Sequence, residues 1–74
     1  MEWYEILKVY AKITENKGIS HYFRPYEHSS IYDMMMDITG NDHEISCGIA
    51  SWCELACVGE VYTFREGYVE IVEE

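Results

Sequence analysis

Four side chains that can bind metals or act as nucleophiles lie close together in the second half of the chain: His43, Cys47, Cys53 and Cys57. On a helix, His43 lies one turn from Cys47, and Cys53 lies one turn from Cys57. The two pairs are about 9 Å apart along the axis, because six residues separate Cys47 from Cys53. One Zn²⁺ with bonds of about 2.3 Å cannot reach all four ligands. The pattern therefore favours buried structural thiols and predicts no metal and no cofactor. A metal or redox module stays an alternative, which thiol titration with and without a chelator separates.

Catalysis has no local signature either. A nucleophilic thiol needs an electropositive setting, whereas the neighbours of these cysteines include Glu44, Glu54 and Glu60. If residues 31–39 form a strand, Asp33 and Asp37 lie about 13 Å apart, too far for a glycosidase carboxylate pair. The chain holds no glycine-rich phosphate loop, no His-Glu-x-x-His and no calcium-loop spacing. The sequence predicts that the protein is not an enzyme.

Acidic residues dominate the charge. Fourteen acids face five bases, giving a formal net charge of −9. Residues 1–25 carry a net charge of +1, while residues 26–74 carry −10 and contain Arg65 as their only base. Such a field repels nucleic acid and anionic membranes and attracts basic partners, and five bases are too few for a nucleic-acid interface. The alternative is that the acidity only keeps a small protein soluble.

Length and composition predict one compact domain that spans residues 1–74. A chain of 74 residues that is 49% hydrophobic has one core and is too apolar for disorder. The first residues include two acids and no basic stretch, so no secretory signal is expected, and no apolar run approaches the roughly 20 residues of a membrane span. Three cysteines do not form an even disulfide framework, which predicts reduced thiols in the cytoplasm.

The hydrophobic patterns predict two helices and four strands. The apolar residues of the segment 3–16 fall on one broad helical arc, and Gly18 suits its C-cap. Residues 19–24 are rich in β-forming types and end before Pro25. Apolar residues alternate with polar ones over residues 31–39, which is typical of a strand. This alternation places Met34 and Met36 in the core and Met35 on the surface.

The second half of the chain predicts a helix followed by a hairpin. Asn41 and Glu44 match a capping box for a helix that ends near residue 58, with Gly59 as its C-cap. Residues 60–64 and 68–73 then form a hairpin closed by the three-residue loop 65–67. Trp3 and Trp52, one on each predicted helix, are expected to anchor the core.

These elements predict an α+β fold in the order α-β-β-α-β-β, with a four-stranded antiparallel sheet and both helices on one face. The halves 1–39 and 40–74 share a helix, a glycine and a following Phe-Arg pair, which allows an αββ pseudo-repeat. Because a helix, a glycine and a strand often follow one another, the repeat remains an open interpretation.

The uncovered sheet face is the predicted binding surface. Residue parity places seven acidic and tyrosine residues on it: Asp33, Asp37, Glu60, Tyr62, Tyr68, Glu70 and Glu74. Carboxylates two residues apart on a strand are about 7 Å apart, a spacing comparable to that of phosphates along a nucleic-acid strand. The sequence thus predicts a protein-binding inhibitor of the anti-defence or immunity type, which blocks the phosphate-binding surface of a basic nucleic-acid-handling protein by nucleic-acid mimicry. The alternative is a homo-oligomeric structural or adaptor subunit that assembles through this face.

Overall fold

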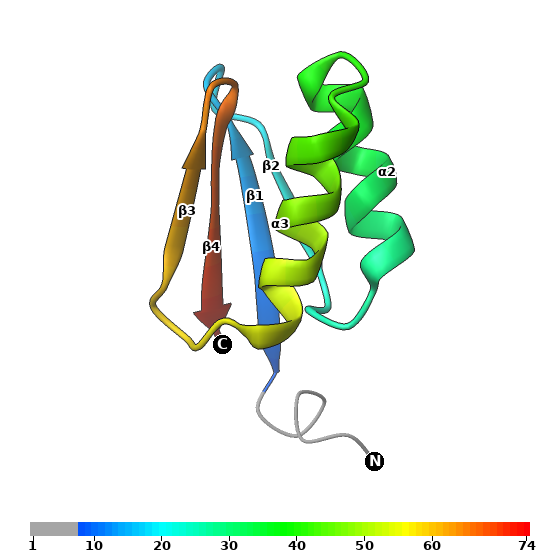
Figure 1. Cartoon of the computed structure of the whole chain (residues 1–74). Coiled ribbons are helices and arrows are strands. Elements are labelled where there is room, and N and C mark those ends of the chain that lie inside the picture. The colour runs from blue at the N-terminus through cyan, green and yellow to red at the C-terminus, as the bar shows by residue number, and fades with distance from the viewer. Residues whose placement is uncertain (1–7) are drawn as a thin grey trace.

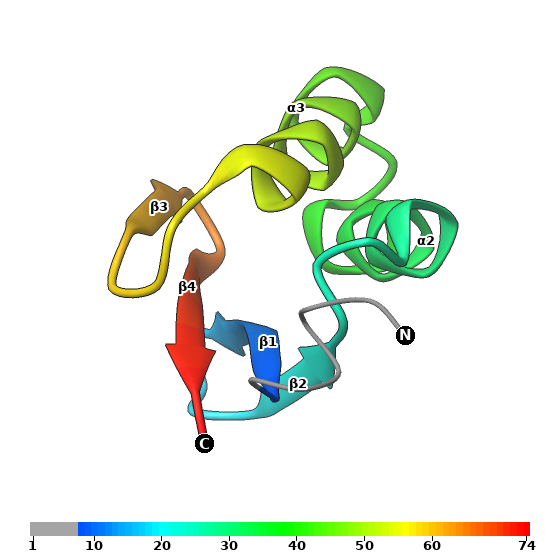
Figure 2. The ribbon, with the colours of Figure 1, turned by 90° about the horizontal axis from the view of Figure 1, so that it is seen from below.

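The computed structural model describes residues 8–74, in which four strands form one sheet and two helices cover one of its faces (Figures 1 and 2). The elements are β1 (Val9–Glu15), β2 (Ser20–Phe23), α2 (His28–Thr39), α3 (His43–Leu55), β3 (Val61–Phe64) and β4 (Gly67–Glu73). The predicted α+β class, with two helices on one face of a four-stranded antiparallel sheet, is confirmed. Within the described part of the chain, no helix has the length and apolar character needed to cross a membrane.

The first and last strands form the centre of the sheet. The strand order is β2-β1-β4-β3 and every neighbouring pair is antiparallel. The central pair β1–β4 matches Ala11 with Ile71, Lys12 with Glu70 and Ile13 with Val69. Two hairpins, one from each end of the chain, therefore lie side by side, and the helix pair connects them.

The predicted helix over residues 3–16 is wrong over its described part, where β1 runs instead. Burial alternates along β1: Val9, Ala11 and Ile13 are buried, while Lys12 and Thr14 are half-buried on the opposite face. The segment contains so many apolar residues that helical and strand periodicities both fit it. Pairing with β2 and β4 on its two sides decides for the strand. The rest of the predicted helix, including Trp3, lies outside the described residues.

The predicted strand over residues 31–39 is wrong as well, because this segment belongs to helix α2. Ile31 and Met35, one helical turn apart, are fully buried, and Ile38 packs against the same core. Met35 is thus a core residue, whereas Met34 and Met36 are only partly buried, the reverse of the prediction. The order of the elements within residues 8–74 is ββααββ, so residues 9–39 contain two strands before a helix and residues 43–73 a helix before two strands.

Helix α3 was predicted correctly, but its ends differ. The N-cap is Asp42, whose carboxylate accepts a hydrogen bond from the Ile45 backbone N–H at 3.1 Å, rather than Asn41. The backbone φ of Asn41 is +72°, a left-handed conformation that suits the connection to α2. The helix ends at Leu55 with Ala56 as its C-cap, and Gly59, at φ +96°, lies in the turn that leads to β3.

The hairpin of β3 and β4 closes with a two-residue turn instead of the predicted three-residue loop. Phe64 pairs with Gly67, so Arg65 and Glu66 alone connect the strands. This changes the register by one residue, and a one-residue change moves side chains to the other face of the sheet. Tyr62 now pairs with Val69 on the helix-covered face.

The core lies between that face and the two helices. Each sheet strand and each helix contributes apolar side chains to it, and the largest fully buried ones are Ile13, Ile31, Met35, Ile49 and Ile71. Trp52 is partly buried, and its ring lies 5.6 Å from that of Tyr62 in an edge-on contact.

Candidate functional site

The structure separates the seven predicted site residues. Asp33 and Asp37 are exposed on α2, on the opposite side of the core from the outer sheet face. Tyr62 points to the helices, whereas Tyr68 and Glu70 lie on the outer face. The prediction that all seven share one sheet face is therefore wrong, because two of its segments were assigned the wrong periodicity or register.

The two remaining predicted residues lie at the ends of strands. Glu60 is exposed just before β3, and its carboxylate accepts a hydrogen bond from the Cys57 backbone N–H. Glu74 is exposed after β4, and its backbone N–H donates to the Lys8 carbonyl oxygen at 3.2 Å. The first contact fixes the turn before β3, and the second extends the pairing of β1 with β4.

The helix pair and its connection carry acidic side chains and no Lys or Arg. Five exposed carboxylates, which we call the acidic helix surface, belong to α2, α3 and their connection: Asp33, Asp37, Asp42, Glu44 and Glu54. No Lys or Arg occurs between Arg24 and Arg65. Among the described residues, no ion pair involves any of these five side chains. Their field is thus not neutralised locally, and it attracts cationic groups.

A groove of about 300 Å³ runs between α2 and α3 and is lined by residues of both helices: His28, Ser29, Tyr32, Asp33, His43 and Cys47. The Tyr32 hydroxyl and the His43 Nδ1 share a hydrogen bond of 2.6 Å, and the two rings meet edge-on at 5.6 Å. Asp33 adds a carboxylate beside them. Sequence reasoning missed this groove, because a strand over residues 31–39 does not bring Tyr32 to His43.

The outer sheet face carries aromatic and cationic side chains that sequence reasoning also missed. Tyr22 is 52% exposed, and the Lys12 ammonium lies 5.9 Å from the centre of its ring. The Arg24 guanidinium lies over the Tyr10 ring at 4.5 Å, and Tyr10 contacts Tyr22 edge-on. The predicted acidic sheet face is thus a mixed face. The predicted helix over residues 3–16 hid this face, since it placed Tyr10 and Lys12 on a helix and not on a strand of the sheet.

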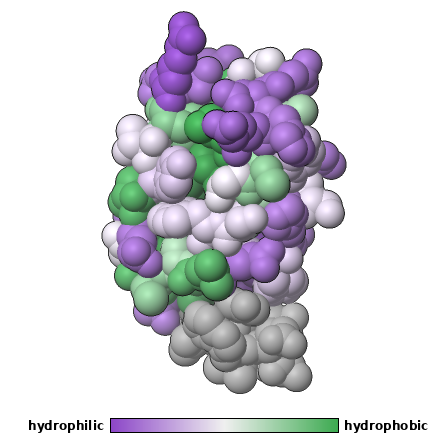
Figure 3. Space-filling view, viewed as in Figure 1, coloured by the Kyte–Doolittle hydropathy of each residue, from purple (hydrophilic) through white to green (hydrophobic). Residues whose placement is uncertain are grey.

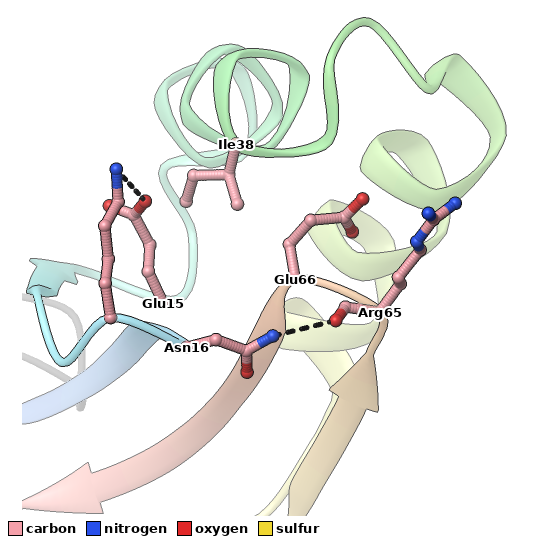
Figure 4. A pocket seen from close by; sticks show the side chains of 6 residues that line it. Glu15, Asn16, Ile38, Arg65 and Glu66 are labelled. Atoms are coloured by element: carbon pink, nitrogen blue, oxygen red, sulfur yellow. Dashed lines mark hydrogen bonds and ion pairs between the residues drawn. The ribbon is translucent and has the colours of Figure 1, made fainter.

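A second hollow, of about 430 Å³, lies where the two hairpin turns approach the end of α2 (Figure 4). The Asn16 backbone N–H donates to the Glu66 carbonyl, and its side-chain amide donates to the Arg65 carbonyl, each at 2.9 Å. The charged side chains around it have both signs, and Lys17 lies 3.8 Å from Glu15. These contacts join the two turns, so we assign a structural role to this end of the molecule.

The three cysteines are free thiols in different surroundings. Cys47 and Cys57 are exposed, while Cys53 is buried in the core. Burial, together with the charge of Glu54, raises the pKa of the Cys53 thiol to about 12. Within residues 8–74, no three His, Cys, Asp or Glu side chains are grouped so that they can hold a metal ion.

Polar residues gather at one end of the molecule, over the strand ends and the loop that joins α2 to α3 (Figure 3). Comparison of the chain with protein-family models, with curated proteins and with solved structures found no match.

Proposed function

We propose that this protein binds and inhibits a basic nucleic-acid-handling protein and that the acidic helix surface occupies its phosphate-binding site. The observation that supports this proposal is that the helix pair carries acidic side chains and no basic Lys or Arg. The helix pair and its connection carry five exposed carboxylates, and no Lys or Arg occurs in residues 25–64. An anionic surface without local counter-charges matches a groove that is built to bind phosphates.

The spacing of the carboxylates on α2 suits such mimicry. Asp33 and Asp37 are one helical turn apart, and side chains at this spacing have Cβ atoms about 5–6 Å from each other. The helix holds them at a fixed separation, so little conformational entropy is lost when a partner binds. The proposed mimicry thus depends on carboxylates of a helix and not, as the sequence pattern predicts, on those of a strand.

The α2–α3 groove supplies a contact that is not purely electrostatic. The hydrogen bond between Tyr32 and His43 orients two aromatic rings beside Asp33. An arginine side chain of the partner can stack on an aromatic ring and pair with a carboxylate at the same place. Arginine is common in phosphate-binding surfaces, so the groove gives the interaction a preferred point of attachment.

The protein acts in the cytoplasm under this proposal, where its targets handle nucleic acid. All three cysteines are free, and the two exposed ones, Cys47 and Cys57, fit a reducing compartment. Small acidic proteins of the anti-defence and immunity type are similar to this chain in size and charge.

The proposal is tested by affinity capture from a host lysate at low and high salt, followed by binding measurements with the captured protein. We expect a basic nucleic-acid-binding protein that is released as salt rises, because exposed charges are screened over about 8 Å at physiological ionic strength. Added DNA or RNA should compete with this protein for the same site. Capture of targets that nucleic acid does not displace would reject the mimicry.

The surface is tested with two variants that change the net charge equally. Asp33→Lys/Asp37→Lys reverses two carboxylates of the acidic helix surface, and Glu73→Lys/Glu74→Lys reverses two exposed carboxylates at the end of β4. We expect the first variant to lose at least about 100-fold in affinity, equivalent to about 2.7 kcal/mol, and the second to lose far less. Equal losses would show that net charge alone matters and would reject the surface.

A further inference from the structure

Among residues 8–74, no helix lies over the outer sheet face, and α2 and α3, which carry the acidic helix surface, lie on the other side of the sheet (Figure 2). The strand register arranges its side chains in rows that run across all four strands. The middle row contains Tyr22, Lys12, Glu70 and Val61, because Tyr22 pairs with Lys12, Lys12 with Glu70, and Glu70 with Val61. Tyr22 and Val61, at the two ends of this row, are 52% and 53% exposed. Large apolar side chains thus flank a central pair of opposite charges.

The side chains of this row are complementary in charge and shape to the same row of a second copy of the chain. A two-fold axis that runs parallel to β1 and β4, midway between them, places β1 of one copy over β4 of the other. Lys12 then faces Glu70 of the second copy, and Tyr22 faces its Val61. Both contacts occur twice, as an isologous interface requires. A cation meets a carboxylate, and an aromatic ring meets an aliphatic side chain, so no like charges face each other.

The next row of side chains is also complementary to the same row of a second copy. It contains Ser20, Thr14, Tyr68 and Thr63, which the register also places side by side. Under the same axis, Thr14 faces Tyr68 and Ser20 faces Thr63 of the second copy. Hydroxyl groups therefore meet hydroxyl groups, and each can donate or accept a hydrogen bond.

We propose that two copies of this chain associate through their outer sheet faces about this axis, as a sheet-on-sheet dimer. The packing is of the aligned kind, in which strand directions differ by about 30°, so the rows match best at the centre, where Lys12 and Glu70 lie. The dimer is independent of the proposed inhibitory surface, because the acidic helix surfaces lie on its two outer sides. Each dimer accordingly presents two separate anionic surfaces.

The interface is small, so the association is reversible. Four strands with a spacing of about 4.8 Å give a width of about 19 Å, and the seven residues of β1 and of β4 at about 3.3 Å each give a length of about 23 Å at the centre. The edge strands β2 and β3 have only four residues each, so the face is smaller than the product of these two lengths. This area is below the roughly 800 Å² per partner of a standard protein interface. We therefore expect a dissociation constant in the micromolar to millimolar range and a measurable exchange with the monomer.

The test is sedimentation equilibrium of the full chain from about 1 μM to about 1 mM, a range that brackets the expected affinity. We expect the average mass to rise from that of one chain, 8.7 kDa, towards twice this value. A mass that stays at that of one chain throughout, or that rises without limit through open-ended assembly, would overturn the proposal.

Three variants locate the interface. Lys12→Glu and Glu70→Lys each place like charges opposite one another across the two-fold axis, so each alone should lose at least tenfold in dimer affinity. An equimolar mixture of the two should form a heterodimer, because one copy then offers two carboxylates and the other two ammonium groups. The double variant Lys12→Glu/Glu70→Lys should form a dimer like the parent, since the charges have only changed places.

These outcomes separate the interface from a general loss of folding. Each single variant also places like charges opposite each other within the sheet, which destabilises the fold, and its circular dichroism spectrum and melting temperature report on this loss of stability. Dimerisation in the mixture requires that both single variants are folded. Single variants that dimerise as the parent does, or folded variants that fail to pair when mixed, would assign the dimer to another surface and overturn the proposal.

Discussion

Gly67 lies directly against the backbone of Thr14, where β4 begins beside β1. A Cβ atom at position 67 would lie far inside van der Waals contact with the Thr14 carbonyl oxygen and 3.0 Å from the Glu15 Cα. The neighbouring atoms belong to the backbone of a central strand, so they cannot rotate away as a flexible side chain can. Glycine is therefore required here by the close approach of two strands.

Gly67→Ala should destabilise the protein strongly. The methyl group forces β1 and β4 apart at their pairing between Glu15 and Gly67, and overpacking of this kind costs about 1–3 kcal/mol or more. Chemical denaturation with urea measures the loss. Gly48→Ala is the matched control: this residue lies within α3, and a Cβ there meets nothing within 4 Å. It should stabilise the helix by about 0.5–1 kcal/mol. Equal effects of the two substitutions would contradict the close approach.

Asp42, rather than Asn41, should carry the N-cap of α3. Asp42→Ala removes the side-chain acceptor of the Ile45 N–H, and the loss of such a cap costs about 1 kcal/mol. Asn41→Gly should be neutral or slightly stabilising, because glycine adopts the left-handed φ of +72° without strain. Thermal unfolding of both variants measures the difference. A larger loss for Asn41→Gly would restore the capping box that the sequence pattern predicts.

The three thiols should differ in reactivity. Cys47 and Cys57 are exposed, whereas Cys53 is 1% exposed and its pKa is raised to about 12. Because only the thiolate reacts, we expect two fast alkylation events in the native protein and a third only after unfolding. Mass spectrometry with peptide mapping identifies the modified residues. A chelator should leave all three rates unchanged, and its acceleration of any of them would support the metal alternative.

Stability should fall at alkaline pH in a way that depends on Cys53. The pKa of its thiol is about 12 in the folded protein, raised from the usual value of 9.0. Below pH 9 the thiol is protonated in both the folded and the unfolded chain, so its titration does not lower the free energy of unfolding. Between pH 9 and about 12 the unfolded chain releases the proton while the folded chain keeps it, so the free energy of unfolding falls. The free energy of unfolding should fall by roughly 1 kcal/mol at pH 10 through this group alone. Comparison with Cys53→Ala isolates this contribution from the titration of tyrosine and lysine, because the difference in stability between the two proteins should narrow above pH 9. A constant difference would contradict the raised pKa.

The charge distribution and several local features follow from the sequence alone. The absence of Lys and Arg between Arg24 and Arg65 can be read directly, and it predicts an anionic surface wherever that segment folds. Helix α3 has one apolar arc and a cap, and the final hairpin has two β-rich runs around a turn, so both elements were predictable. The α+β class followed from the number and type of these elements, even where single assignments were wrong.

Tertiary contacts determined the secondary structure of two segments whose apolar residues fit both a helical and a strand spacing. Residues 9–15 are apolar at both strand and helix spacings, and only pairing with β2 and β4 makes them a central strand. Residues 31–39 alternate like a strand, yet they also contain Ile31 and Met35 at a helical spacing, and burial against the sheet and α3 selects the helix. The face on which Tyr68 and Glu70 lie depends on a turn that is one residue shorter than its sequence suggests. The local sequence determined where charges and turns lie along the chain. Which residues share a surface was determined by the strand or helix that packs against each apolar face.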